Sequence, residues 1–130
     1  MNGDHAAIRD LIARYALSLD AGDIDECVEL FADDAEFLVY GRSFAGHHGI
    51  GDMFREAPRG LHLTGVSRID VDGDTATARS QVLFVRAGTL QLRPALYDDE
   101  LVRDGGCWRF RRRRCRFVTT HGLSDNPEAP

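Results

Sequence analysis

The sequence predicts an α+β fold in which N-terminal helices pack in a curved antiparallel sheet. Two observations indicate this class. Residues 5–56 contain all the helix-period apolar patterns and helix-capping signals of the chain. From residue 61 onward, strand-forming runs alternate with turns, and no further helical pattern follows. Helices followed by a meander of strands are typical of α+β domains, and such a sheet can form a cone whose mouth is a pocket.

The first helix is expected over residues 5–20. At 3.6 residues per turn, two adjacent rows form an apolar stripe, one of Ile8, Ile12, Ala16 and Asp20 and the other of Leu11, Tyr15 and Leu19. The rest of the fold must cover this stripe, so Tyr15 and Asp20 are directed toward the interior or a cavity in it. Two simpler interpretations remain open: Asp20 swings into water at a frayed last turn, and Tyr15 is a core aromatic.

Local signals predict the remaining elements. Gly22 ends the first helix, and the capping-box pattern at 23–26 predicts a second helix over residues 24–31. A third helix is expected over 50–56, where Pro58 stops it. The expected strands are 35–40, 43–45, 61–71, 75–85, 90–102 with a break at Pro94, and 107–119.

A single domain is expected over residues 1–120, because a chain of 130 residues suits one core. Residues 121–130 contain Gly, Asn and two Pro, which predict a flexible C-terminal tail. No apolar run approaches the roughly twenty residues of a membrane span, and the N-terminus lacks a signal-peptide pattern. We therefore expect a cytoplasmic protein with no membrane partner.

Composition narrows the partners further. The net charge is −5, which argues against nucleic acid as a partner. The three cysteines, Cys27, Cys107 and Cys115, have no metal-type spacing and are expected to be free thiols. His47 and His48 are adjacent between glycines and are expected at a loop rim rather than in a metal pair. We expect no metal site.

Several segments follow the pattern of a known family. They are DAGD at 20–23, LFADDA at 30–35, His62, VDGDTA at 71–76, Tyr97, DEL at 99–101 and WRF at 108–110, together with residues 8–15, Gly46 and Ile50. With these segments the chain resembles the SnoaL-like polyketide cyclase and dehydratase group of the nuclear-transport-factor-2-like superfamily. The resemblance implies a cone-shaped α+β barrel with a deep apolar pocket, and a homodimer formed through the outer face of the sheet.

The resemblance also implies a catalytic trio. Members similar to scytalone dehydratase or bile-acid dehydratases carry a Tyr and an Asp on the first helix and a His at the start of a long strand, which match Tyr15, Asp20 and His62. Some relatives have an Asn shortly after that His, where Val66 stands here.

The chemistry of these three side chains suits acid/base catalysis. His62 titrates near neutrality and can move a proton, Asp20 can orient it, and Tyr15 can hydrogen-bond a carbonyl oxygen as negative charge develops. We expect a dehydratase, isomerase or cyclase that needs no cofactor and acts on a small apolar oxygenated ring substrate such as a polyketide or steroid-like compound. The alternative is a non-catalytic small-molecule-binding or accessory protein of the same fold, in which His62 is a hydrogen-bonded strand histidine.

The run from Arg109 to Arg116 contains six Arg in eight positions. Side chains alternate along a strand, so some of these guanidinium groups face the barrel interior or an interface unless a bulge redirects them. One interpretation pairs them with the acidic residues 98–100 of the preceding strand. The other is a clamp for a ligand carboxylate or phosphate. The candidate substrate-binding residues are Phe31, Phe54, Tyr97 and Arg113.

Overall fold

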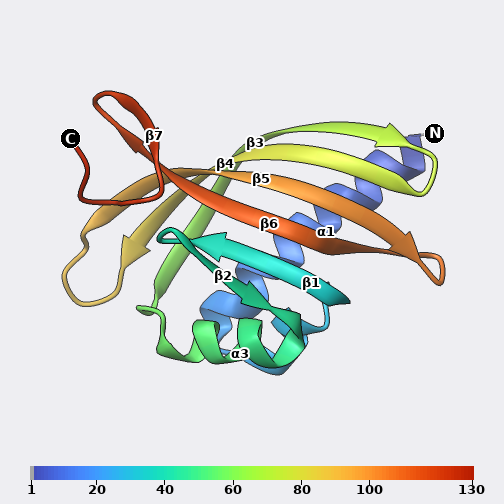
Figure 1. Cartoon of the computed structure of the whole chain (residues 1–130), viewed down its shortest axis with the longest axis horizontal. Coiled ribbons are helices and arrows are strands. Elements are labelled where there is room, and N and C mark those ends of the chain that lie inside the picture. The colour runs from blue at the N-terminus through green and yellow to red at the C-terminus, as the bar shows by residue number, and fades with distance from the viewer. Residues whose placement is uncertain (1) are drawn as a thin grey trace.

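A computed structural model describes residues 2–130 and confirms the α+β class (Figure 1). Its elements in chain order are α1 (Asn2–Ala21), α2 (Ile24–Val28), β1 (Phe31–Val39), β2 (Arg42–Ala45), α3 (Gly46–Glu56), β3 (Gly60–Asp72), β4 (Thr75–Arg86), β5 (Leu92–Asp104), β6 (Cys107–Thr119) and β7 (Gly122–Ser124). None of the helices in this part of the chain is both long and apolar enough to cross a membrane.

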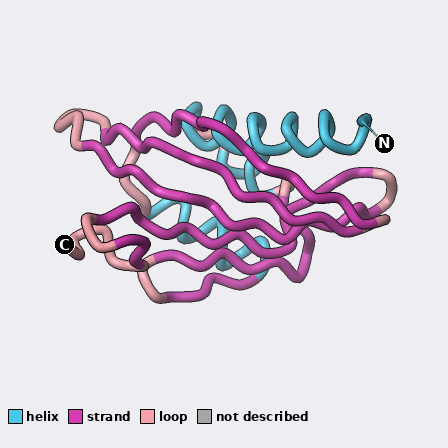
Figure 2. Tube along the Cα trace, turned by 90° about the horizontal axis from the view of Figure 1, so that it is seen from above, coloured by secondary structure: helices cyan, strands magenta, loops and turns pink. Residues whose placement is uncertain are grey.

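The strands form one curved, open sheet in the order β2-β1-β6-β5-β4-β3, with β7 added beside β6. The pairing of β1 with β6 is parallel and the other pairings are antiparallel, so the sheet is mixed. The helices lie against one face of this sheet (Figure 2). In particular, α1 packs against β3 and β6, which puts the C-terminal end of α1 beside the beginning of β3.

The predicted apolar stripe of α1 is buried in the core, where Ile8, Leu11, Ile12 and Tyr15 are all less than 5% exposed. The helix ends at Gly22, whose φ of +83° is a conformation that glycine adopts without steric cost. The amide of Gly22 donates to the carbonyl of Leu19 at 3.1 Å. This sharp ending holds the last turn of α1 in place, with Asp20 still inside the helix.

The predicted second helix over 24–31 is too long, because α2 stops at Val28 and Phe31 is already the first residue of β1. Phe31 pairs in register with Phe110 of β6, so a distant strand decides its backbone conformation. For the same reason β1 begins four residues earlier than the expected strand at 35–40. The helix signals at residues 23–31 are local, so they carry no information about the pairing of Phe31 with β6.

The expected flexible tail over 121–130 contains a strand and several contacts with the sheet. β7 pairs with the end of β6, Arg114 contacts Asp125, and Arg93 contacts Glu128. Pro94, the expected strand break, lies inside β5. It is tolerated there because the pairing of β5 with β6 ends at Ala95, so this position has no partner on that side.

Candidate active site

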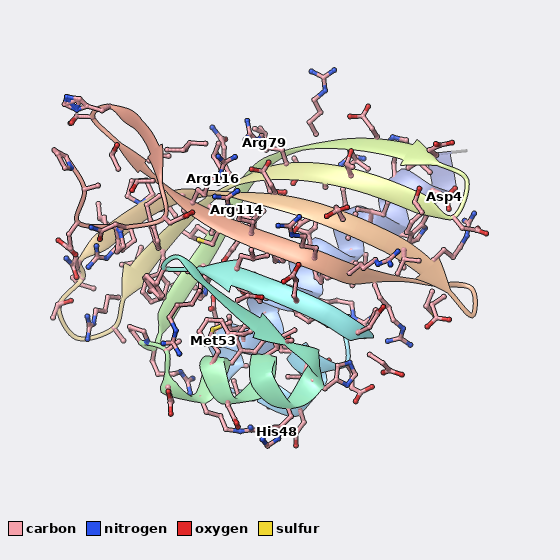
Figure 3. The ribbon with its side chains drawn as sticks, in the orientation of Figure 1. Asp4, His48, Met53, Arg79, Arg114 and Arg116 are labelled. Atoms are coloured by element: carbon pink, nitrogen blue, oxygen red, sulfur yellow. The ribbon has the colours of Figure 1, made fainter. Side chains whose placement is uncertain are left out.

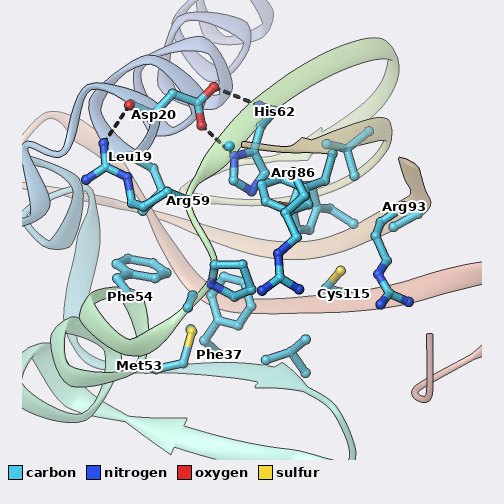
Figure 4. A pocket seen from close by; sticks show the side chains of 18 of the residues that line it. Leu19, Asp20, Phe37, Met53, Phe54, Arg59, His62, Arg86, Arg93 and Cys115 are labelled. Atoms are coloured by element: carbon cyan, nitrogen blue, oxygen red, sulfur yellow. Dashed lines mark hydrogen bonds and ion pairs between the residues drawn. The ribbon is translucent and has the colours of Figure 1, made fainter. Parts of the chain in front are cut away.

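A carboxylate and an imidazole meet where the end of α1 touches the beginning of β3. Oδ1 of Asp20 lies 2.5 Å from Nδ1 of His62, and Oδ2 of Asp20 accepts a hydrogen bond of 2.7 Å from the backbone amide of His62. The carbonyl oxygen of Asp20 accepts a third hydrogen bond, from the Arg59 guanidinium at 3.1 Å (Figure 4). Both side chains of the pair are 15% exposed. Asp20 is therefore neither frayed nor free in solvent, and it fixes both the ring and the backbone of His62.

This contact determines which nitrogen of His62 can react. Nδ1 faces the carboxylate of Asp20, so a neutral ring carries its proton there and leaves the lone pair on Nε2. Nε2 forms no hydrogen bond within residues 2–130. Burial lowers the pKa of His62 below its usual value, against the opposite effect of Asp20. Near neutral pH, His62 is therefore a neutral base with Nε2 available.

Asp20 and His62 border a cavity of about 250 Å³ between the helices and the concave side of the sheet. The lining is largely apolar, with a few polar side chains among aliphatic and aromatic ones (Figure 4). It consists of Tyr15, Leu19, Asp20, Ile24, Phe37, Val39, Tyr40, Met53, Phe54, Ala57, Pro58, Arg59, Gly60, His62, Val82, Phe84, Arg86, Arg93, Ala95, Tyr97, Cys115, Phe117 and Pro127. A cavity of this kind suits a small apolar ligand.

Two phenols, Tyr15 and Tyr97, lie together on the wall of this cavity, with ring centroids 5.8 Å apart. The Tyr15 ring is 6.4 Å from the His62 ring. Burial raises the pKa of Tyr15 well above its usual value, and the neighbouring Tyr97 adds to this effect. Burial raises the pKa of Tyr97 in the same way. Both hydroxyl groups thus stay protonated near neutral pH and can donate hydrogen bonds.

The structure separates the four candidate substrate-binding residues. Phe54 and Tyr97 line the cavity, whereas Phe31 and Arg113 are fully buried behind its wall and do not line it. Arg113 lies 3.1 Å from Asp99 and stacks on the ring of Tyr97, with its Cζ 3.7 Å from the ring centroid. A guanidinium group in this position supports the phenols and does not reach a ligand.

Two other arginines of the run pair with the preceding strand, as one of the two interpretations predicts. Arg112 contacts Glu100 at 3.6 Å, and Arg116 contacts Asp98 at 2.7 Å. On the outer face of the sheet, Arg79 also reaches Asp98, at 2.6 Å (Figure 3). These contacts favour the interpretation of pairing within the sheet, and Arg113, the candidate for substrate binding, is enclosed in the core next to Asp99.

The adjacent histidines of α3 make separate contacts. His47 is hydrogen-bonded to the carbonyl oxygen of Phe31 at 2.7 Å, and His48 lies 3.2 Å from Asp52 on the surface. Within the described part of the chain, no group of three or more His, Cys, Asp or Glu side chains is arranged to hold a metal ion.

Several lining residues were not predicted from the sequence. Phe84 packs against His62 with the rings tilted and their centroids 4.7 Å apart, and Arg86 and Arg93 lie at the edge of the cavity. Side chains alternate along β4, so Val82, Phe84 and Arg86 lie on the same face of the strand. This alternation was already visible in the sequence. It becomes informative only when one residue of the strand is known to face the cavity.

An apolar cavity within a helix-covered curved sheet, with a histidine and a carboxylate at its border, is the arrangement expected of an α+β domain that binds small molecules. The SnoaL-like domain model matches residues 3–114, and the chain belongs to this family. The comparison with curated proteins gave no match.

Three solved structures illustrate the similarity. Rv3472, a protein of unknown function from Mycobacterium tuberculosis, is 29% identical over 88% of this chain and 71% of its own, with a TM-score of 0.82. An NTF2-like protein with a cystatin-like fold from Novosphingobium aromaticivorans is 28% identical over 91% of this chain and 84% of its own, also with a TM-score of 0.82. The hexachlorocyclohexane dehydrochlorinase LinA-type3 from Novosphingobium barchaimii is 24% identical over 98% of this chain and 95% of its own, with a TM-score of 0.78.

Proposed function

We propose that this protein is a cofactor-independent acid/base enzyme that eliminates water from an apolar ring compound carrying a hydroxyl group β to a carbonyl. The observation that carries this proposal is the double contact of Asp20 with the ring and the backbone amide of His62. It aims one basic nitrogen at a cavity that is otherwise largely apolar. A merely structural histidine does not need its second nitrogen left without a partner beside a cavity.

The elimination uses His62 twice. Nε2 of His62 removes a proton from the carbon next to the carbonyl, and the electrons of that C–H bond form an enolate. Tyr15 donates a hydrogen bond to the enolate oxygen, where the negative charge develops. The enolate then expels the β-hydroxyl, which takes the proton from Nε2 and leaves as water. The products are the conjugated carbonyl compound and one water molecule, and His62 returns to its neutral state.

The family supports a reaction of this type. The chain is a SnoaL-like domain, and among the solved structures of similar fold LinA-type3 is named as a dehydrochlorinase. A dehydrochlorinase removes a proton and a leaving group from neighbouring carbons, which is the same pattern of bond breaking as dehydration. Isomerisation and aldol-type cyclisation begin with the same proton abstraction and remain within the proposal's chemistry.

The proposal is tested with 3-hydroxy-1-tetralone, whose dehydration gives 1-naphthol, in D₂O. We expect the wild-type protein to accelerate both deuterium incorporation next to the carbonyl, followed by NMR, and naphthol formation, followed by fluorescence. His62→Gln should lose both activities. His48→Gln is the matched control, because His48 is a surface histidine that contacts only Asp52. Equal rates for wild type and His62→Gln would contradict the assignment of His62.

The outer face of the sheet favours a second property, self-association. Leu61, Leu63 and Leu92 are about half exposed, and Leu61 and Leu92 both pair in register with Val85. An apolar patch of this kind is typical of a protein interface. We propose that two copies meet here. Light scattering should report a dimer for the wild-type protein and a monomer for Leu63→Arg, and a monomeric wild type would contradict this proposal.

A further inference from the structure

Two arginines border the cavity on the strands that form its wall. Arg86 is the last residue of β4, and Arg93 lies near the start of β5. Phe84 pairs in register with Arg93, and side-chain alternation puts Arg86 on the same face as Phe84. Figure 4 shows both guanidinium groups extending from their strands toward the cavity. Two neighbouring positive charges therefore lie where the apolar inner face of β4 and β5 ends.

Few negative charges oppose these arginines. Arg86 has no side-chain hydrogen bond or ion pair within the described residues, although it lines the cavity. Arg93 contacts Glu128 of the C-terminal segment at 2.5 Å. The carboxylate of Asp20, which also borders the cavity, is engaged by His62. The cavity edge thus has an excess of positive charge in a chain whose net charge is −5.

The contact between Arg93 and Glu128 indicates that this edge favours a carboxylate. The guanidinium group of Arg93 forms an ion pair with a carboxylate at the rim of the cavity, as it would with a ligand carboxylate. Glu128 is 68% exposed, and an ion pair with so exposed a partner is weak. A carboxylate attached to an apolar body inside the cavity can replace Glu128 and also engage Arg86.

We propose that the ligand of this cavity is an apolar molecule with a carboxylate at the end that stays at the mouth, bound by Arg86 and Arg93. The inference rests on the proposed function in taking this cavity as the substrate site, and it adds a carboxylate to the substrate class. The apolar body then extends past Phe84 toward His62. The same arginines exclude cationic ligands.

The test compares two probes with the same apolar body, naphthalene-2-carboxylate and naphthalene-2-carboxamide, by isothermal titration calorimetry. We expect the wild-type protein to bind the carboxylate at least about tenfold more tightly than the amide. Arg86→Gln should bring this ratio close to one while leaving the affinity for the amide unchanged. Arg111→Gln is the matched control, because Arg111 is exposed on β6 and its loss changes the net charge equally.

Glu128→Gln provides a second variant whose expected effect is a gain. It frees Arg93, so the affinity for the carboxylate should rise and that for the amide should not. Damage to the fold does not produce such a selective gain. Equal affinities of the two probes for the wild-type protein, no saturable binding of the carboxylate, or an equal loss in Arg111→Gln would overturn the proposal. An unchanged carboxylate affinity in Glu128→Gln would show that Arg93 does not bind the ligand carboxylate.

The binding test is independent of catalysis. His62→Gln should keep the preference for the carboxylate, because the arginines lie on β4 and β5 and the histidine on β3. A preference for the carboxylate without any His62-dependent turnover would support carboxylate binding by Arg86 and Arg93 and contradict the proposed function. Turnover that depends on His62, together with equal affinities for the two probes, would contradict only the carboxylate binding by Arg86 and Arg93.

Discussion

Arg113 and Asp99 form an ion pair in the core, with Nε of Arg113 3.1 Å from Oδ1 of Asp99 and neither side chain exposed. They are directly opposed on β6 and β5. The pair lacks well-aligned hydrogen bonds within the described residues. Instead, the rings of Tyr97 and Tyr15 cover the guanidinium, at 3.7 and 4.2 Å from their centroids. The two phenols of the cavity wall therefore rest on a buried cation.

Breaking this ion pair should destabilise the protein strongly. Arg113→Met leaves the Asp99 carboxylate buried without its partner, which costs about 3–5 kcal/mol. Replacing both residues, as Arg113→Met with Asp99→Leu, should restore most of the loss, because no charge then remains buried. Urea unfolding measures both effects. Wild-type stability of the single variant would contradict the importance of the pair.

The Asp99 carboxyl should make stability depend on pH. Burial raises its pKa to about 6, from a usual value of 3.8, despite the attraction of Arg113. The folded protein therefore binds more protons than the unfolded chain between these values, so this contribution is complete below pH 3.8 and is lost as the pH rises through 6. Asp99→Asn should remove this dependence from unfolding free energies measured between pH 4 and 7. An unchanged dependence would mean that another group causes it.

Asp20 should act on turnover through His62. Asp20→Asn removes the carboxylate that orients the ring, and we expect kcat to fall about 10²- to 10⁴-fold. Burial lowers the pKa of His62 and Asp20 opposes this, so the acidic limb of kcat/KM should lie below pH 6.5 in the wild type and move lower in the variant. NMR titration of the His62 ring gives the same direction independently. Asp52→Asn, beside the surface His48, is the control and should change neither value.

Tyr15→Phe should lower kcat more than it changes KM. The hydroxyl is expected to bind the carbonyl oxygen mainly as negative charge develops, and loss of such a donor costs about 10²-fold or more. The ring remains to fill the core, so circular dichroism and the melting temperature should change little. Tyr40→Phe, at the half-exposed edge of the cavity, should retain turnover. An equal loss in both variants would argue against a specific role of Tyr15.

Gly60 should be required for the close approach of β3 and β4 two residues before His62. A Cβ at this position would lie 2.6 Å from the Phe84 ring and collide with the carbonyl oxygen of Val85. Gly60→Ala should therefore destabilise the protein by about 1–3 kcal/mol and reduce turnover by moving His62. Gly49→Ala, on α3, meets ordinary contacts at 3.8 Å and should be tolerated. Thermal unfolding of both variants provides the comparison.

Local patterns were sufficient for most elements. The predicted strand 107–119 coincides with β6. The strand at 61–71 is one residue shorter than β3 at each end, and the strand at 75–85 is one residue shorter than β4 at its C-terminal end. These segments alternate strongly and end at Gly-containing turns, so their signals are local. The end of α2 and the start of β1 were missed, because Phe31 becomes a strand residue only through its pairing with Phe110.

The position of Arg113 could not be read from alternation alone. The register between β5 and β6 shifts between Glu100 and Leu101, where Leu101 pairs with Phe110 but Glu100 with Arg112. Arg111 is the extra residue of this bulge, and as a result both Phe110 and Arg113 face inward. A period of two cannot show where such a shift occurs, and a shift of one residue turns every later side chain to the other face.

Periodicity along the chain was enough to place the amphipathic first helix and the long strands, and to locate Tyr15, Asp20 and His62 on them, because helix and strand periods depend on neighbouring residues only. The folded structure was needed to show that Asp20 contacts both the ring and the backbone amide of His62, that Arg113 is enclosed in the core, and that Arg86 and Arg93 border the cavity. These relationships join residues from strands and helices far apart in the chain. Their geometry depends on register, on the bulge and on the burial of charge, which exist only once the sheet has formed.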